Sequence, residues 1–192
     1  FLYSEVELDN RKTGEKLFDY VDPRNRASQI EMEAAATGHL KAIGAYLKPS
    51  FKSVDLKAEP FDVEASIMIP VRNRIRTIRD AIESALSQKT NFKFNVFIVE
   101  NGPDYHSTDG TTELIDEYKN DERVIHIIPN RRDIGVGNSW NMAAHHPQCG
   151  RFIVQLDSDD VYSDEHTLQK FVDAFYEQQC AMVIGSYMLT DI

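Results

Sequence analysis

The chain has 192 residues, of which 42% are hydrophobic and 10% aromatic, and 21 basic against 31 acidic side chains give a formal net charge of -10. This length and apolar content fit a domain with a buried core and argue against disorder. The acidic balance excludes a general preference for nucleic acid, and no apolar run approaches the ~18 residues of a membrane span.

The first part of the chain, residues 1–60, is predicted to be an N-terminal extension whose role is unknown. Apolar residues recur there at helical spacing between residues 27 and 48, which predicts one helix that ends before Pro49. The chain begins with Phe1 and stops within an apolar stretch, so we expect it to be a piece of a longer protein.

The second part, residues 61–192, is predicted to be a separate α/β domain in which strands and helices alternate. The expected strands lie at residues 65–70, 94–100, 123–128, 151–156 and 181–188, and the expected helices at 75–88, 111–119, 137–146 and 164–179. Strands that alternate with helices predict a mostly parallel, Rossmann-like sheet flanked by helices. Since such sheets bind ligands outside the carboxyl ends of their strands, we expect a site there.

Three carboxylates, those of Asp157, Asp159 and Asp160, follow the predicted strand at 151–156. Two carboxylates ~4 Å apart repel by roughly 1 kcal/mol in water and by about 4 kcal/mol at the dielectric of a protein surface. A bound cation relieves that repulsion, and oxygen ligands of this kind suit Mg²⁺ or Mn²⁺ shared with substrate phosphates. The alternative is an acidic loop that precedes the next helix. A calcium-binding EF-hand is excluded, because Tyr162 and Leu168 stand at its invariant Gly and Glu positions.

Basic residues follow two of the other strands. Arg72 lies in the first strand-to-helix turn and should face the site, whereas Arg74, Arg76 and Arg79 are expected to point mostly to solvent. Arg131–Arg132 lie in an equivalent turn and are candidates to contact phosphate. The chain has no phosphate-binding P-loop and no serine nucleophile motif, which excludes those chemistries.

Three stretches resemble family 2 inverting glycosyltransferases, in order and at the expected spacing over about residues 64–189. They are SIMIPVRNRIRTIRDAIESALSQ, VENGPDYHSTDGTTELIDEY and NRRDIGVGNSWNMAAHHPQCGRFIVQLDSDD. The resemblance implies a GT-A fold and a metal-dependent, inverting transfer from a UDP- or GDP-linked sugar. It also implies a saccharide or lipid-linked acceptor hydroxyl, in the synthesis of a cell-surface polysaccharide or glycan.

The same resemblance implies roles for individual residues. Pro70 and Arg72 should line the base pocket, Glu100 should contact the base or its ribose, and Gly135 and Asn141 should shape the loop under the diphosphate. Asp159 should be the main metal ligand, joined by Asp157, which also reaches toward the ribose. The full set expected to bind the donor is Pro70, Val71, Arg72, Glu100, Asn101, Gly135, Asn141, Asp157 and Ser158.

The sequence also departs from the pattern of that family. Residues 103–106 form an insertion, and Trp140 stands where an Arg is common. The acidic residue that serves as general base in the family is expected beyond residue 192, so no catalytic residue is assigned.

Two other functions and a cellular location also enter as expectations. A sugar-phosphate nucleotidyltransferase would carry a Gly-rich, basic loop after the first strand, where this chain has Pro70–Arg74, and a non-catalytic metal- or nucleotide-binding interaction domain stays open. The two cysteines, Cys149 and Cys180, form no disulfide framework, so we expect a location in the cytoplasm, including the inner face of the membrane.

Overall fold

The computed structural model describes residues 26–52, 54–56, 59–101, 106–130 and 135–186. The chain separates into two units, residues 1–52 and 53–192, so the division falls before the predicted boundary at residue 60. Three parts of the sequence that were singled out lie outside the described residues: residues 103–105 of the insertion at 103–106, the basic pair at 131–132, and the end of the last predicted strand.

The first unit contains α1 (Arg26–Ala42). The spacing predicts a helix at 27–48, so α1 ends six residues before the predicted end. Gly44 follows with a φ of 70°, the left-handed conformation that commonly ends a helix, and the backbone N–H of Ala45 reaches back to the carbonyl of Leu40 at 2.9 Å. No residue of α1 is buried, and Met32 is 66% exposed. Among residues 26–52, the described part of this unit, the helix therefore has no core to pack against.

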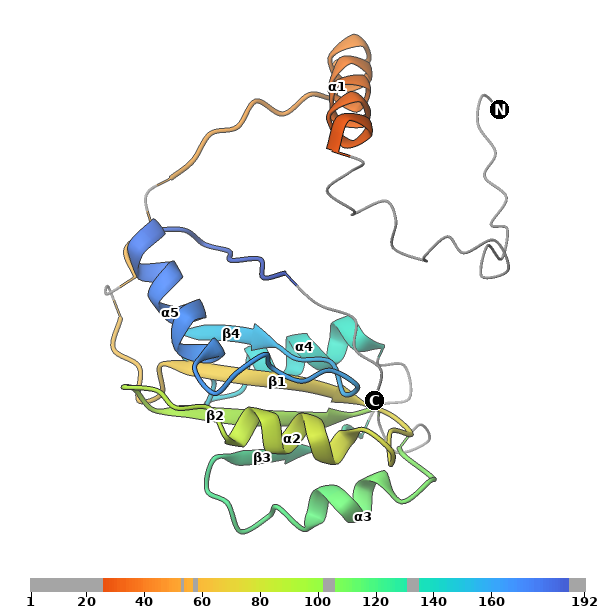
Figure 1. Cartoon of the computed structure of the whole chain (residues 1–192), viewed down its shortest axis with the longest axis vertical. Coiled ribbons are helices and arrows are strands. Elements are labelled where there is room, and N and C mark those ends of the chain that lie inside the picture. Colours follow the sequence, from red (N-terminus) through yellow and green to blue (C-terminus); the bar gives the residue numbers. More distant parts are fainter. Residues whose placement is uncertain (1–25, 53, 57–58, 102–105, 131–134, 187–192) are drawn as a thin grey trace. The chain divides into compact units, whose positions relative to one another are not determined.

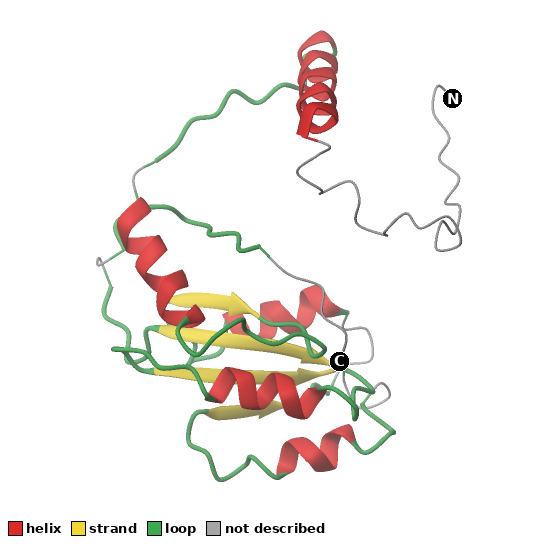
Figure 2. Cartoon of the chain, in the orientation of Figure 1, coloured by secondary structure: helices red, strands yellow, loops and turns green. Residues whose placement is uncertain are grey.

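The second unit is built on one sheet of four parallel strands (Figures 1 and 2). The strands are β1 (Ala65–Val71), β2 (Phe94–Glu100), β3 (Val124–Ile127) and β4 (Phe152–Gln155), in the spatial order β3-β2-β1-β4. The helices between and after them are α2 (Ile78–Leu86), α3 (Thr111–Asp116), α4 (Val136–Ala144) and α5 (Thr167–Gln178). The predicted α/β fold with a parallel sheet flanked by helices is confirmed.

Helices cover both faces of this sheet, and one apolar cluster lies between the helices and the sheet on each face. One cluster joins alternate residues of β1, such as Ile67 and Ile69, to apolar residues of α2, α3 and α5. The smaller cluster joins Met68 and Phe97, which point the other way, to Ala143 of α4. Strands buried on both faces read as continuous apolar runs, which is why ASIMIPV and FNVFIVE were recognisable in the sequence.

The order of the strands creates a switch point between β1 and β4. The chain steps outward from β1 to β2 and β3, then returns through α4 to place β4 on the other side of β1. Because the two connections leave in opposite directions, the carboxyl ends of β1 and β4 are not bridged by a crossover helix. Parallel α/β sheets bind their ligands at such a point.

β4 is also shorter than its neighbour, which opens space at the switch point. Its last ladder partner on β1 is Met68, and the N–H of Leu156 bonds to the Met68 carbonyl at 3.0 Å. Pro70, two residues further along, faces the same side, where β4 no longer needs a donor from it. A proline in this central strand is tolerated for that reason.

The prediction of a fifth strand at 181–188 is wrong for the described part of that segment. Residues 181–186 form no strand, and Met182 and Ile184 are 72% and 85% exposed. Their β-branched and apolar composition favours a strand, but a strand also needs a neighbour to pair its backbone groups. The segment leaves α5 through Gln179 at a φ of 50° and lies beside Phe171 without joining the β4 ladder.

Candidate functional site

A cavity of about 420 Å³ lies at the switch point, between the carboxyl ends of β1 and β4. Seven of the residues predicted from the sequence line it, although they come from three separate parts of the chain. They are Pro70, Val71, Arg72, Asn101, Asp157, Ser158 and Asp159. The structure therefore brings most of the predicted donor-binding and metal-binding residues to one place.

Three predicted residues do not line this cavity. Gly135, which precedes α4, and Asn141, which lies within it, are exposed and are not among the residues that line the cavity. Glu100 is fully buried, with an exposed fraction of 0%. Their proposed contacts with a donor stay predictions.

Glu100 has three hydrogen-bond partners inside the protein. One carboxylate oxygen accepts from the backbone N–H of Ser107 at 3.0 Å and the hydroxyl of Thr112 at 2.9 Å, and the other lies 2.9 Å from Nε2 of His126. Burial by itself would raise the pKa of this carboxyl, but the hydrogen bonds outweigh it and lower the pKa to about 2. Glu100 is thus an ionised anchor that ties α3 and β3 to the end of β2.

The loop after β4 holds the carboxylates in a turn. The N–H of Asp160 bonds to the Asp157 carbonyl at 3.1 Å, and the hydroxyl of Thr77, at the start of α2, donates to the Ser158 carbonyl at 2.8 Å. Burial raises the pKa of Asp160, and the nearby charges of Asp157 and Asp159 raise it further. The three carboxylates therefore repel one another, as expected from their spacing in the sequence.

The donor atoms at this edge fit a hard divalent ion. Asp157 accepts from Nε2 of Gln155 at 3.0 Å through one oxygen, and Asp159 pairs with Nε of Arg74 at 3.5 Å through one oxygen. Among the described residues, the second oxygen of each carboxylate has no hydrogen-bond partner. No group of three or more His, Cys, Asp or Glu in the described part of the chain could enclose a metal alone. Two carboxylates with open coordination suit Mg²⁺ or Mn²⁺, which take their remaining ligands from phosphates and water.

Four lining residues were not predicted from the sequence as part of the site. They are Arg74, Val136, Trp140 and Gln155. Arg74 was expected to face solvent together with Arg76 and Arg79, but α2 begins only at Ile78, so Arg74 lies in the turn before it. The turn pattern Pro70–Arg74 was a signal that could have placed it at the strand end. For Trp140 the family resemblance was a signal, since an Arg is common at that position, whereas for Val136 none was available before the packing of α4 on β1 and β2 was known.

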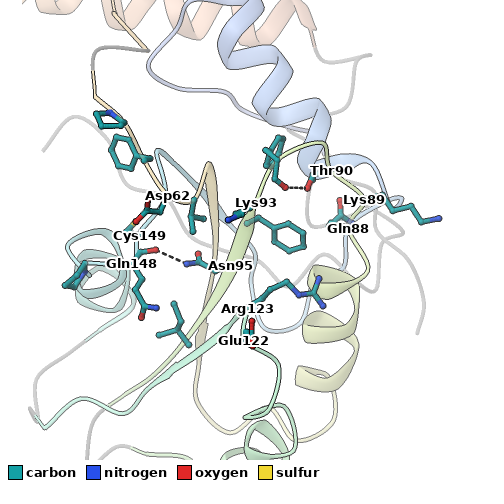
Figure 3. A pocket seen from close by; sticks show the side chains of 17 residues that line it. Asp62, Gln88, Lys89, Thr90, Lys93, Asn95, Glu122, Arg123, Gln148 and Cys149 are labelled. Atoms are coloured by element: carbon teal, nitrogen blue, oxygen red, sulfur yellow. Dashed lines mark hydrogen bonds between the residues drawn. The ribbon is translucent and has the colours of Figure 1, made fainter.

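A larger cavity, of about 1020 Å³, lies at the opposite edge of the same sheet (Figure 3). Its walls come from segments that precede the strands, including Asp62, Lys93 and Gln148. Figure 3 shows the hydrogen bond between the side chain of Asn95 and the Gln148 carbonyl, which is 2.8 Å long. The amide of this wall residue therefore holds the loop at Gln148 in place. None of the predicted site residues lies there, and amino ends of parallel strands are not where these folds bind ligands. The smaller cavity is the better candidate.

Comparison with known proteins agrees with the sequence resemblance. The model of the family described as "Glycosyl transferase family 2" matches residues 66–192. An uncharacterized glycosyltransferase of Rickettsia felis is 35% identical over 114 residues, which cover 58% of this chain and 18% of that protein. The putative teichuronic acid biosynthesis glycosyltransferase TuaG of Bacillus subtilis is 29% identical over 124 residues, which cover 65% of this chain and 46% of TuaG. Among solved structures, that of S. aureus TarS covers 59% of this chain and 20% of its own, with 24% identity and a TM-score of 0.49.

The chain belongs to glycosyl transferase family 2. It spans less than half the length of the two curated relatives above. No helix within the described residues is both long enough and apolar enough to cross a membrane.

Proposed function

We propose that residues 53–192 bind the nucleotide-diphosphate sugar that a family 2 glycosyltransferase uses as donor. The observation that carries the proposal is the convergence of Arg72, Asp157 and Asp159 on one cavity at the switch point of a parallel sheet. A pyrophosphate needs positive charge and hydrogen-bond donors, whereas the chain as a whole carries -10. An edge that combines arginines with two ion-binding carboxylates meets that need.

In this proposal each group has a defined task. Pro70, Val71, Arg72 and Asn101 form the wall for the base, and Asp157 and Asp159 hold Mg²⁺ or Mn²⁺. The ion, when bound, neutralises the charge that develops on the leaving nucleoside diphosphate. Gly135 and Asn141 remain assigned to the loop beneath the diphosphate on the resemblance alone.

The buried Glu100 has an indirect role in this proposal. Its carboxylate holds Ser107 and Thr112, and Ser107 in turn accepts from the backbone N–H of Asn73 in the turn that follows β1. Glu100 has no exposed surface, so a contact with the base would require the residues that cover it to move.

The finer points of the reaction are proposals of the same kind. We infer an inverting transfer of a sugar to a saccharide or lipid-linked hydroxyl, because the family resemblance implies it. TuaG is described as a putative teichuronic acid biosynthesis enzyme, which supports an acceptor that belongs to a cell-surface polymer. The general base is assigned to none of the described residues. The expected cytoplasmic location, including the inner membrane face, stays a prediction that cell fractionation tests.

Calorimetric titration of the chain with UDP and GDP, each with and without Mn²⁺, tests the proposal. We expect one of the two nucleotides to bind and its affinity to depend on the metal. Binding of Mn²⁺ without any effect on nucleotide would instead support the alternative, a non-catalytic metal-binding interaction domain. Uptake of a nucleoside triphosphate in preference to either diphosphate would support the nucleotidyltransferase alternative.

A further inference from the structure

Arg74 forms an ion pair with the carboxylate that is proposed as the main metal ligand. Its Nε lies 3.5 Å from Oδ2 of Asp159, and both residues line the cavity at the switch point. The two side chains are 46% and 53% exposed, so both can be reached by a ligand and both can move.

The turn that carries Arg74 is held in place by a segment more than 30 residues away in the sequence. Asn73 adopts a left-handed backbone with a φ of 52°, which asparagine tolerates better than most residues. Four hydrogen bonds tie this turn to residues 107–111: Asn73 N to Ser107 Oγ (3.1 Å), Thr108 N to Asn73 Oδ1 (2.8 Å), Arg74 N to Thr111 Oγ1 (2.9 Å) and Ile75 N to Asp109 Oδ2 (3.1 Å). The backbone of Arg74 is therefore positioned, while its side chain stays exposed.

The charges around Arg74 suggest why it is positioned there. Asp157, Asp159 and Asp160 follow β4 in a protein that is acidic overall, and their repulsion is relieved only by a cation. In the protein without ligand, Arg74 supplies that positive charge to Asp159. A guanidinium carries five N–H donors in a plane, so the same group suits a phosphate oxygen as well as a carboxylate.

We propose that Arg74 is a stand-in cation that pairs with Asp159 in the ligand-free protein and pairs with the diphosphate of the donor once a divalent ion occupies Asp159. The inference rests on the proposed function, since it needs a nucleotide and a metal at this cavity. It adds a positioning and binding role for a residue that the sequence pattern had placed in solvent.

The proposal predicts effects of opposite sign for the two ligands in Arg74→Ala. Without nucleotide, Mn²⁺ no longer competes with the guanidinium for Asp159, so its binding should tighten by about 2–5-fold, as removal of an exposed ion pair allows. With Mn²⁺ saturating, the nucleoside diphosphate loses a charged donor, and its binding should weaken by about 10-fold or more.

The test is a set of calorimetric titrations of the chain and three variants, with thermal unfolding to confirm that each variant folds. Mn²⁺ is titrated alone, and UDP and GDP are titrated at saturating Mn²⁺. Arg74→Lys keeps the charge and should retain much of the nucleotide affinity. Arg76→Ala removes an exposed arginine two residues away that does not line the cavity, and both of its affinities should match the unmodified chain.

The outcomes separate this inference from the one beneath it. Changes of both affinities in the same direction in Arg74→Ala, or no change in either, overturn the stand-in role while the unmodified chain still binds nucleotide. Absence of metal-dependent nucleotide binding in the unmodified chain overturns the proposed function, and the stand-in role with it.

Discussion

The two edges of one sheet differ in what their side chains are used for. At the amino edge the larger cavity is walled by groups such as Asn95 and Gln88, whose polar atoms bond to neighbouring backbone. At the carboxyl edge the smaller cavity gathers Arg72, Arg74 and the carboxylates after β4, and the ion pair between Arg74 and Asp159 there is about half exposed. The larger cavity is therefore not the better candidate, because the smaller one collects charged side chains at a switch point of the sheet.

The largest expected difference between the two edges appears when one carboxylate is removed from each edge in turn. Asp159→Ala should abolish metal-dependent nucleotide binding, a loss on the order of a hundredfold or more, because one of the two proposed ion ligands disappears. Asp62→Ala, at the amino-edge cavity, should leave that binding unchanged. Isothermal calorimetry in the presence of Mn²⁺ measures both. Retention of full affinity by the Asp159 variant would count against the site assignment.

Glu100 lies at the carboxyl edge, but its charge stabilises the fold, because its buried carboxylate bonds to Ser107, Thr112 and His126. Its folded pKa of about 2 lies below its ordinary value of 4.5, so its charge contributes stability that is fully present above about pH 4.5. That contribution is lost as the pH falls toward 2, and it amounts to roughly 3 kcal/mol at most. Glu100→Gln should thus lower the free energy of unfolding at pH 7, and its difference from the unmodified chain should shrink between pH 5 and pH 3.

Urea denaturation at a series of pH values measures that effect. Glu113→Gln provides the control, since Glu113 lies exposed on α3 next to the same network. His126 also lies near a second carboxylate, with its Nδ1 3.6 Å from Asp116, so the comparison is made between variants at each pH. A Glu100 variant with unchanged stability at pH 7 would show that the buried charge is not an anchor.

A substitution at the amino edge should change the stability of the protein and leave its nucleotide affinity unchanged. Gln88 is 5% exposed; its Nε2 donates to the Asp164 carbonyl at 2.8 Å and its Oε1 accepts from the Leu168 N–H at 2.8 Å. Gln88→Ala removes the partner of the Leu168 N–H and one of the two donors to the Asp164 carbonyl, which keeps the Thr167 N–H at 3.4 Å. The change should cost about 1–3 kcal/mol of unfolding free energy. The nucleotide affinity of the folded variant should stay the same.

Chemical denaturation and calorimetry of the same preparations test this last prediction. Lys93→Ala, at the same cavity but exposed, should change stability by no more than about 0.5 kcal/mol. A Gln88 variant that is stable but binds nucleotide poorly would mean that the amino edge contributes to the site after all.

The sequence by itself determined the layers of this protein and the edge at which to look. Apolar runs such as Phe94–Glu100 and the helical period of Ile78–Leu86 are local signals, and both are visible without knowledge of any partner. The carboxylates after β4 were recognisable for the same reason, because they directly follow an apolar run. The apolar segment at 181–186 shows the limit of such signals, since composition does not supply a neighbouring strand.

Only the tertiary structure decided how the polar side chains are used. Arg74 faces Asp159 because residues 107–111 hold its turn, and Glu100 turns inward because Ser107, Thr112 and His126 bond to it. These contacts join residues far apart in the chain, and a hydrogen bond depends on distance and direction that no local spacing records. Which charges are satisfied within the protein, and which are left for a ligand, follows from that geometry.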